Sequence, residues 1–161
     1  METCKILYRG KTKATNEWAF GDALINGLDD VAIRAKFIYP SGNITNRSKI
    51  EHLTPYEVLR VDTSTLNLYS GLNDKNGTKI FDGDIVRVKH EGKTYVGTIG
   101  NDTYAVFAFV ARSFGWIALH DLISDSDIEK TLVGNALCVG AVEVIGNATD
   151  DNVDDFTGGK K

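Results

Sequence analysis

The chain is cut into short apolar runs by corners of glycine, asparagine and aspartate, and this spacing limits the folds that are open to it. In residues 71–86, GLNDKNGTKIFDGDIV, three glycines and two such corners separate the runs. Glycine takes a positive φ at little steric cost, and Asn76-Gly77 is a strong signal for a β-hairpin turn. A phosphate-binding loop would instead lead its glycines into a helix. Strand-forming residues follow, so we interpret these glycines as turns, with a positive φ at Gly83 and with Asp84 accepting a nearby backbone N–H.

The N-terminal part predicts a hairpin followed by further strands. Two runs, residues 6–9 and 18–24, are separated by a polar stretch, which is the layout of a hairpin with a longer loop. Gly21 inside the second run suggests a bulge or a close backbone approach. Residues 31–39 alternate with period two, and a further strand follows Pro55. We therefore expect a β-rich N-terminal subdomain over residues 1–70.

The second half predicts a small barrel or sandwich. Runs rich in Tyr, Val, Phe, Ile and Trp recur over residues 93–119, close to the roughly 8–12 residues between turns that such folds show. Both faces of residues 103–110, TYAVFAFV, are apolar. That strand must be covered on both sides, either in the core or at a subunit interface. The fold class is thus mainly β, a β-rich α+β protein.

One short helix is predicted near residues 126–133, ahead of a final strand that ends at Asn147. Ser126 and Glu129 have the spacing of a capping box, and Gly134 is a stop signal. Beyond it, residues 148–161 are acidic and poor in apolar side chains, which predicts a disordered tail.

Composition and length allow a hydrophobic core that needs no disulfide or metal cross-links. The chain has 161 residues, of which 42% are hydrophobic. Its N-terminus reaches charged residues before any apolar run of signal-peptide length, and no run approaches the roughly 18 apolar residues of a membrane span. We therefore expect a cytoplasmic protein without membrane contact, and we interpret Cys4 and Cys138 as thiols. No pattern indicates a cofactor.

The distribution of charge argues against nucleic-acid binding as a general property. The net charge is −4, and residues 61–146 contain seven Lys and Arg against eleven Asp and Glu. Affinity for phosphate backbones comes largely from clustered Lys and Arg. A basic cluster in the N-terminal hairpin is either a phosphate contact or a solvated face, and each tryptophan either packs in the core or meets a partner. The candidate binding residues are Lys5, Arg9, Lys11, Lys13, Trp18 and Trp116.

The sequence contains neither a catalytic nor a metal-binding pattern. The histidines, His52, His90 and His120, lack the spacing of metal ligands. Ser113 and Asp121 complete the residue types of a triad with His120, but no nucleophile-elbow motif surrounds a serine. The acids near the predicted helix are explained by its dipole, because the central glycine of a calcium loop is missing. We expect no catalytic, cofactor or metal site.

Three segments resemble the YopX family. They are KILYRGKTKATNEWAFG at residues 5–21, LYSGLNDKNGTKIFDGDIVRV at residues 68–88 and VEVIGN at residues 142–147. The resemblance implies a small protein of a phage or prophage with no assigned activity, and an SH3-type β-barrel over residues 71–147. It brings no catalytic residues. The chain departs from the family pattern after Asn147, where relatives continue with a proline-containing acidic ending.

Two classes of function remain. The first is a non-catalytic binding or assembly module, which contacts a second copy of itself or a host or phage protein through its β surface or strand edges. The second is a nucleic-acid accessory protein that uses the barrel face and the basic N-terminal hairpin, an argument by analogy of fold. An enzyme is the third and least supported class.

Overall fold

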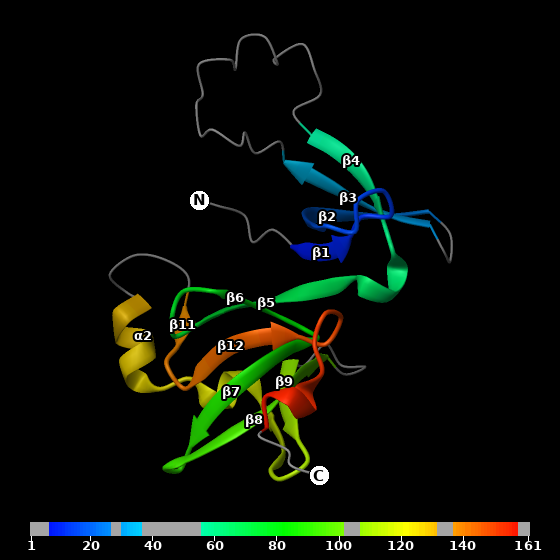
Figure 1. Ribbon diagram of the computed structural model, residues 1–161. Coiled ribbons are helices and arrows are strands. Elements are labelled where there is room, and N and C mark those ends of the chain that lie inside the picture. Colours follow the sequence, from blue (N-terminus) through cyan, green and yellow to red (C-terminus); the bar gives the residue numbers. More distant parts are fainter. Residues whose placement is uncertain (1–6, 27–29, 37–55, 102–106, 132–136, 158–161) are drawn as a thin grey trace. The chain divides into compact units, whose positions relative to one another are not determined.

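The computed structural model is mainly β, as the sequence predicts (Figure 1). The chain divides into two compact units, residues 1–68 and 69–161, which we call the N-terminal unit and the C-terminal unit. Among the described residues no helix is long and apolar enough to cross a membrane.

Predictions that concern Cys4, Lys5, His52 and Gly134 lie outside the described residues. The structure describes residues 7–26, 30–36, 56–101, 107–131 and 137–157.

The N-terminal unit is an antiparallel sheet in which each strand pairs with the next along the chain. The predicted hairpin is confirmed, and its loop closes through a hydrogen bond from the Thr12 N–H to the Glu17 carbonyl. The strands are β1 (Tyr8–Lys11), β2 (Trp18–Asn26), β3 (Asp30–Lys36) and β4 (Tyr56–Val61), and β5 (Asn67–Asp74) pairs with β1 through its first two residues.

A close backbone approach in this unit lies at Gly10. Gly21 pairs in regular register with Tyr8 and Ala35, so the bulge that the sequence suggests there is absent. A Cβ on Gly10 would instead come within 3.1 Å of the buried Val61 side chain. Glycine lets β1 lie against the small core of this unit.

The C-terminal unit is built on a five-stranded antiparallel sheet in the order β10-β9-β8-β7-β12. Strands β7 and β8 form a long hairpin (green in Figure 1). The strands β10 and β12 form the two edges of this sheet in the described residues, so the sheet is not closed and the SH3-type barrel stays a prediction. The bounds are β7 (Asp84–His90), β8 (Lys93–Asn101), β9 (Phe107–Ala111), β10 (Gly115–Ala118) and β12 (Val142–Asn147).

Shorter elements complete this unit. The second part of β5 pairs antiparallel with β6 (Lys79–Phe81) and parallel with β11 (Cys138–Val139). A 3-10 turn, η3 (Leu119–Leu122), follows β10. The core lies against one side of the five-stranded sheet, which we call its inner face. The residues buried there are Ile80, Val86, Val88, Ile99, Phe109, Ala111, Leu119, Leu122, Val139 and Val142.

Strand β9 is covered on its inner face but not on the other. Phe109 is fully buried and Ala111 is nearly so, whereas Val110 between them is 45% exposed. The sequence of this strand is apolar on both faces and therefore predicts that both faces are covered. The described residues therefore exclude a position in the middle of the core for this part of the strand, and they leave the alternative of an interface.

The predicted turn at Asp74-Gly77 is confirmed, with a difference in its conformation. The Gly77 N–H donates to the Asp74 carbonyl at 3.0 Å, and the Asp74 N–H donates to the Thr78 carbonyl at 2.7 Å. Gly77 has φ +83°, whereas Asn76 is not among the described residues with positive φ. This pattern is a type I turn followed by a glycine bulge.

Two buried aspartates hold the turns of residues 71–86. The Asp74 carboxylate accepts the backbone N–H groups of Asn76 and Thr78 and also that of Val144, at 2.8 to 2.9 Å. The predicted role of Asp84 is confirmed, because its Oδ2 accepts the Phe81 N–H at 2.8 Å. Gly83 has the predicted positive φ, +83°. These residues turn the chain and join β5 to the final strand β12.

The predicted helix is present as α2 (Asp125–Thr131), but its capping box is not the predicted one. The Asp127 N–H donates to Ser124 Oγ at 3.1 Å, and the Ser124 N–H donates back to Asp127 Oδ2 at 3.0 Å. Asp127 is also reached by the Gly140 N–H, at 3.1 Å. This third contact ties α2 to the turn before β12, so the box forms at Ser124 and Asp127 rather than at Ser126 and Glu129.

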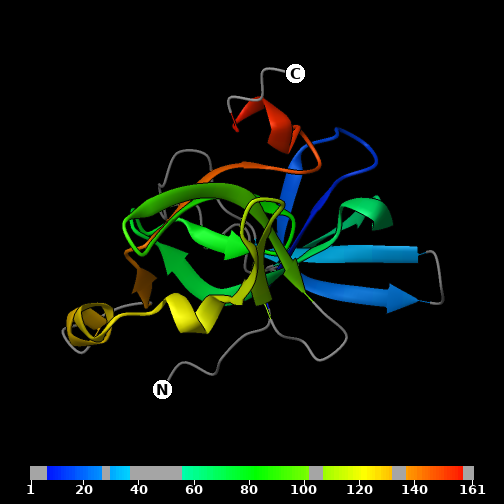
Figure 2. The same cartoon turned by 90° about the horizontal axis from the view of Figure 1, so that it is seen from below.

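The acidic ending is folded through Thr157, which corrects the prediction of disorder from residue 148. The Asn147 side chain accepts the N–H groups of Thr149 and Asp150, and the Asn152 side chain caps a 3-10 turn, η4 (Val153–Asp155). Figure 2 shows this segment, in red, continuing from β12. The sequence offers only one large apolar side chain here, but side-chain caps satisfy the backbone locally.

Candidate functional site

The side of the five-stranded sheet that faces away from the core carries one continuous row of residues, and we call this side the outer face. Cross-strand pairing places Gly146, Ile85, Thr98, Val110 and Trp116 opposite one another on β12, β7, β8, β9 and β10. Residues opposite each other in antiparallel strands project to the same side. The row therefore crosses the whole sheet.

The two ends of this row differ in exposure. Trp116 is 70% exposed and Val110 is 45% exposed, whereas Ile85 is fully buried. Single exposed apolar residues are common, but adjacent large ones on one face of a sheet mark a candidate contact surface. The structure thus places Trp116 at the surface. The sequence allowed either a position in the core or a position at a contact surface.

The covered end of the row is closed by the C-terminal segment. A Cβ on Gly146 would lie 2.7 Å from Asp151 Oδ2 and 3.1 Å from Phe156 Cζ, so the absence of a side chain makes room for the Phe156 ring. The turn η4 also lies close to β8. The outer face is therefore half covered by the chain itself.

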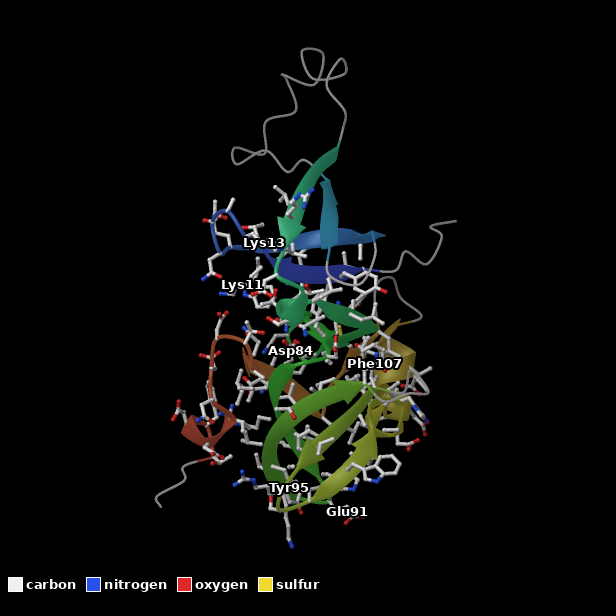
Figure 3. The ribbon with its side chains drawn as sticks, turned by 90° about the vertical axis from the view of Figure 1, so that its right-hand side faces the viewer. Lys11, Lys13, Asp84, Glu91, Tyr95 and Phe107 are labelled. Carbon is white, nitrogen blue, oxygen red and sulfur yellow. The ribbon has the colours of Figure 1, made fainter. Side chains whose placement is uncertain are left out.

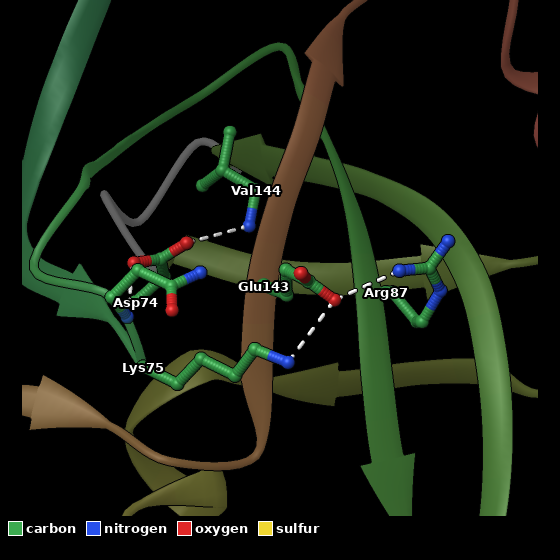
Figure 4. A network of polar contacts seen from close by, with 6 residues as sticks. Asp74, Lys75, Arg87, Glu143 and Val144 are labelled. Atoms are coloured by element: carbon green, nitrogen blue, oxygen red, sulfur yellow. Dashed lines mark hydrogen bonds and ion pairs between the residues drawn. The ribbon is translucent and has the colours of Figure 1, made fainter.

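A charged network lies on the same face, in the next row of the sheet (Figure 4). The Glu143 carboxylate accepts a hydrogen bond from the Arg87 guanidinium at 2.8 Å and lies 3.2 Å from the Lys75 ammonium. Hydrogen bonds from Arg87 and then Lys75 hold the pKa of the Glu143 carboxyl below its usual value. A lowered folded-state pKa adds stability at neutral pH that is lost as the pH falls through that pKa. Because these groups are partly exposed, the contribution is small.

Two more exposed cations lie on or next to this sheet. Lys89 lies two residues beyond Arg87 on β7, so it projects to the same side, and it is exposed. Arg112 is exposed in the turn that joins β9 to β10. The sequence does not single out Val110, Arg87 or Lys89, because only the strand register places them on the same face as Trp116. It does not single out Arg112 either, which follows β9 in the turn.

The basic hairpin forms a second surface, in the N-terminal unit. Arg9 and Lys11 lie two residues apart on β1 and both reach the Trp18 ring, with their cationic groups 4.8 and 5.3 Å from its centroid. Arg9 Nε also donates to Asn67 Oδ1 at 3.1 Å, and Arg9 is only 8% exposed. Trp18 is half-buried beneath the two cations. These contacts are cation–π pairs within the unit.

Lys13 lies apart from this stack, in the exposed loop (Figure 3). It contributes a minor attraction to Asp62, whose pKa is lowered first by the hydrogen bonds from Ser64. Of the predicted binding residues, the structure therefore brings Arg9, Lys11 and Trp18 together and places Trp116 in the other unit. No predicted candidate accompanies Trp116 within the C-terminal unit.

The residues of the predicted triad types lie on the surface. His120 Nε2 is 3.2 Å from Asp121 Oδ1, and both side chains are more than half exposed. Ser113 is exposed in the turn that joins β9 to β10. In the described part of the chain, no group of three or more His, Cys, Asp or Glu side chains could hold a metal ion.

Comparison with known proteins assigns the family. A family model described as "YopX protein" matches residues 7–152, which is most of the chain. The match includes the turns of residues 71–86 and the closing strand β12 that carry the resemblance in the sequence. No curated protein is significantly similar to the chain. The chain therefore belongs to the YopX family.

Proposed function

We propose that this protein is a non-catalytic binding or assembly module of a phage or prophage, which acts in the host cytoplasm through the outer face of the C-terminal unit. The observation that carries the proposal is the pair formed by Trp116, 70% exposed, and Val110, 45% exposed. Tryptophan is among the side chains that contribute most to binding when a partner covers it. Arginine is enriched in such contacts as well, and the exposed Arg112 lies two residues beyond Val110, in the turn after β9.

The same proposal includes an SH3-type barrel in the C-terminal unit. Four strands follow one another as a meander from β7 to β10, and the final strand β12 returns to lie beside β7. Small barrels of this kind are formed when a twisted sheet of few strands curls on itself. In such a fold the outer face is the surface that remains available to partners.

Affinity purification from the host tests the proposal. We expect the tagged chain to retain at least one host or phage protein, and the Trp116→Ala variant to retain about tenfold less of it, because a buried tryptophan anchor is lost. Ile128→Ala is the matched control, since Ile128 is 49% exposed and belongs to α2, which is not part of the five-stranded sheet. Quantitative mass spectrometry of the retained proteins measures the difference.

Equal retention by the wild type and Trp116→Ala would contradict the proposal. Light scattering of the purified chain reports assembly with itself.

A second candidate function, nucleic-acid binding through the basic hairpin, is favoured by the stack of Arg9 and Lys11 on Trp18. Two features weigh against it. Arg9 is largely buried, and the ring that would stack on a base is already in contact with two cations.

We therefore expect no measurable binding of single-stranded or duplex DNA by the wild type at low ionic strength. The measurement is a salt titration with labelled oligonucleotides, in which binding to phosphates weakens steeply as salt rises. Binding that has this salt dependence and is lost in Lys11→Glu would favour the second candidate instead.

A further inference from the structure

We propose that the exposed half of the outer face binds an acidic peptide segment with an aromatic side chain, supplied by another protein. The inference rests on the proposed function, because it names the partner chemistry for the same surface. Trp116, Val110, Arg87, Lys89 and Arg112 carry it.

The covered half of the face shows what kind of segment packs there. It is occupied by the end of the chain itself, residues 148–157, in which Phe156 is the one aromatic residue among several aspartates. The Phe156 ring lies against Gly146 in the cross-strand row, beside the Asp151 carboxylate. An aromatic ring flanked by aspartates therefore already packs on this face within one chain.

The exposed half offers an apolar contact of the same kind. Trp116 and Val110 are direct cross-strand neighbours, and Val110 Cγ2 also lies 4.0 Å from the position of a Cβ on Gly100. The missing side chain at Gly100 leaves the Val110 methyl groups open on that side. We call the surface formed by Trp116 and Val110 the apolar floor. An aromatic ring of a partner can pack on this floor and against the edge of the Trp116 indole, in an offset or edge-to-face arrangement.

The charges around this floor are complementary to carboxylates. Arg112 lies two residues beyond Val110, and Arg87 and Lys89 lie on the same face of β7, which β8 separates from β9. Glu143, which is already shared by Arg87 and Lys75, is the one acidic side chain on this face of the described strands. Arginine binds carboxylates through two parallel hydrogen bonds. At the covered end the aspartates of residues 148–157 would repel an acidic ligand, so the electrostatic field directs it to the Trp116 end.

The distances suit a short extended peptide. Neighbouring strands lie about 4.8 Å apart, so the three spacings from β10 to β7 amount to roughly 14 Å. Arg87 and Lys89 also lie two and four residues along β7 from the row of Trp116, so the direct spans are about 16 and 19 Å. An extended chain rises about 3.3 Å per residue, and six or seven residues therefore reach from Trp116 to the cations on β7.

The source of the segment is another protein rather than a second copy of this chain. The chain's own acidic segment is held in place by Phe156 and by the caps at Asn147 and Asn152, so its release would cost those contacts. A nucleic acid fits less well, because a continuous phosphate backbone would pass close to the aspartates at the covered end.

The experiment uses a fluorescein-labelled peptide, DDNVDDFT, copied from residues 150–157, with the full-length protein at low salt. We expect a rise in fluorescence anisotropy that is reduced about tenfold in affinity for the Arg112→Glu, Lys89→Glu double variant. The matched control is Lys130→Glu, an exposed lysine on α2, which should bind as the wild type does. Peptides with every aspartate changed to asparagine, or with the phenylalanine changed to alanine, should bind about tenfold more weakly as well.

Absence of peptide binding, equal binding of the neutral peptide, or displacement by lower concentrations of oligothymidine would each overturn the inference. Concentration-dependent dimers that disappear in Phe156→Ala would assign the face to a second copy and would also overturn it. If the peptide fails while capture from the host still depends on Trp116, only this inference falls. If capture does not depend on Trp116, the proposed function falls with it.

Discussion

Replacing Gly97 by alanine is expected to lower the stability of the C-terminal unit by about 3 kcal/mol or more. Gly97 lies in β8 on the inner face, where a Cβ would come within 2.1 Å of the Val110 carbonyl oxygen. It would also lie 2.8 Å from the Phe109 ring and 2.9 Å from the Ala111 methyl group. Because a backbone atom of the neighbouring strand stands in the way, no side-chain rotation can relieve the overlap.

The measurement is the urea concentration at the midpoint of unfolding. The midpoints are compared between proteins whose free energy of unfolding falls with urea concentration at the same slope. Gly100→Ala in the same strand is the matched control, because its Cβ would meet only Val110 Cγ2, at 4.0 Å. In a strand, alanine is about 0.5 to 1 kcal/mol more favourable than glycine, so this control should be neutral or stabilising. An unchanged midpoint for Gly97→Ala would show that β8 and β9 do not approach each other in this way.

Replacing Asp74 by alanine is expected to cost about 3 kcal/mol. The Asp74 side chain is fully buried, and its two oxygens accept three backbone N–H groups from two segments of the chain. Water can replace the carboxylate at Asn76 and Thr78, which are exposed. It reaches the half-buried Val144 less well, so most of the loss comes from that donor.

The same urea titration measures the loss, and Asp121→Asn on the exposed surface is the control with an expected change near zero. Hydrogen exchange adds a local test, since the Val144 N–H should lose protection in Asp74→Ala while amides in the N-terminal unit keep theirs. Equal protection of Val144 in both proteins would mean that Asp74 does not bind β12.

The turns of the C-terminal unit could be predicted from the sequence because their chemistry is local. Gly83 needs a positive φ, and Asp84 bonds a residue only three positions away. The bond from Val144 to Asp74 joins residues 70 positions apart, and no pattern of nearby residues indicates it. Helix α2 illustrates the same limit. Two overlapping box patterns fit the sequence, and the contact of Asp127 with Gly140 decides between them.

The binding surface was predictable only in part for the same reason. Both tryptophans sit in strand-like runs, so composition does not reveal that Trp18 lies under two cations while Trp116 is open to solvent. The register of β9 against β10 decides which apolar side chains accompany Trp116. The fold of the ending depends on Phe156 and on the absence of a side chain at Gly146, which lie ten residues apart.

The central claim is that Trp116 lies open on the outer face of the free protein, and iodide quenching of single-tryptophan variants tests it most directly. Trp18→Phe leaves only Trp116, and Trp116→Phe leaves only Trp18. We predict strong quenching of Trp116 and weak quenching of Trp18, which is half-buried beneath Arg9 and Lys11. A Trp116 as well shielded from iodide as Trp18 would contradict the account.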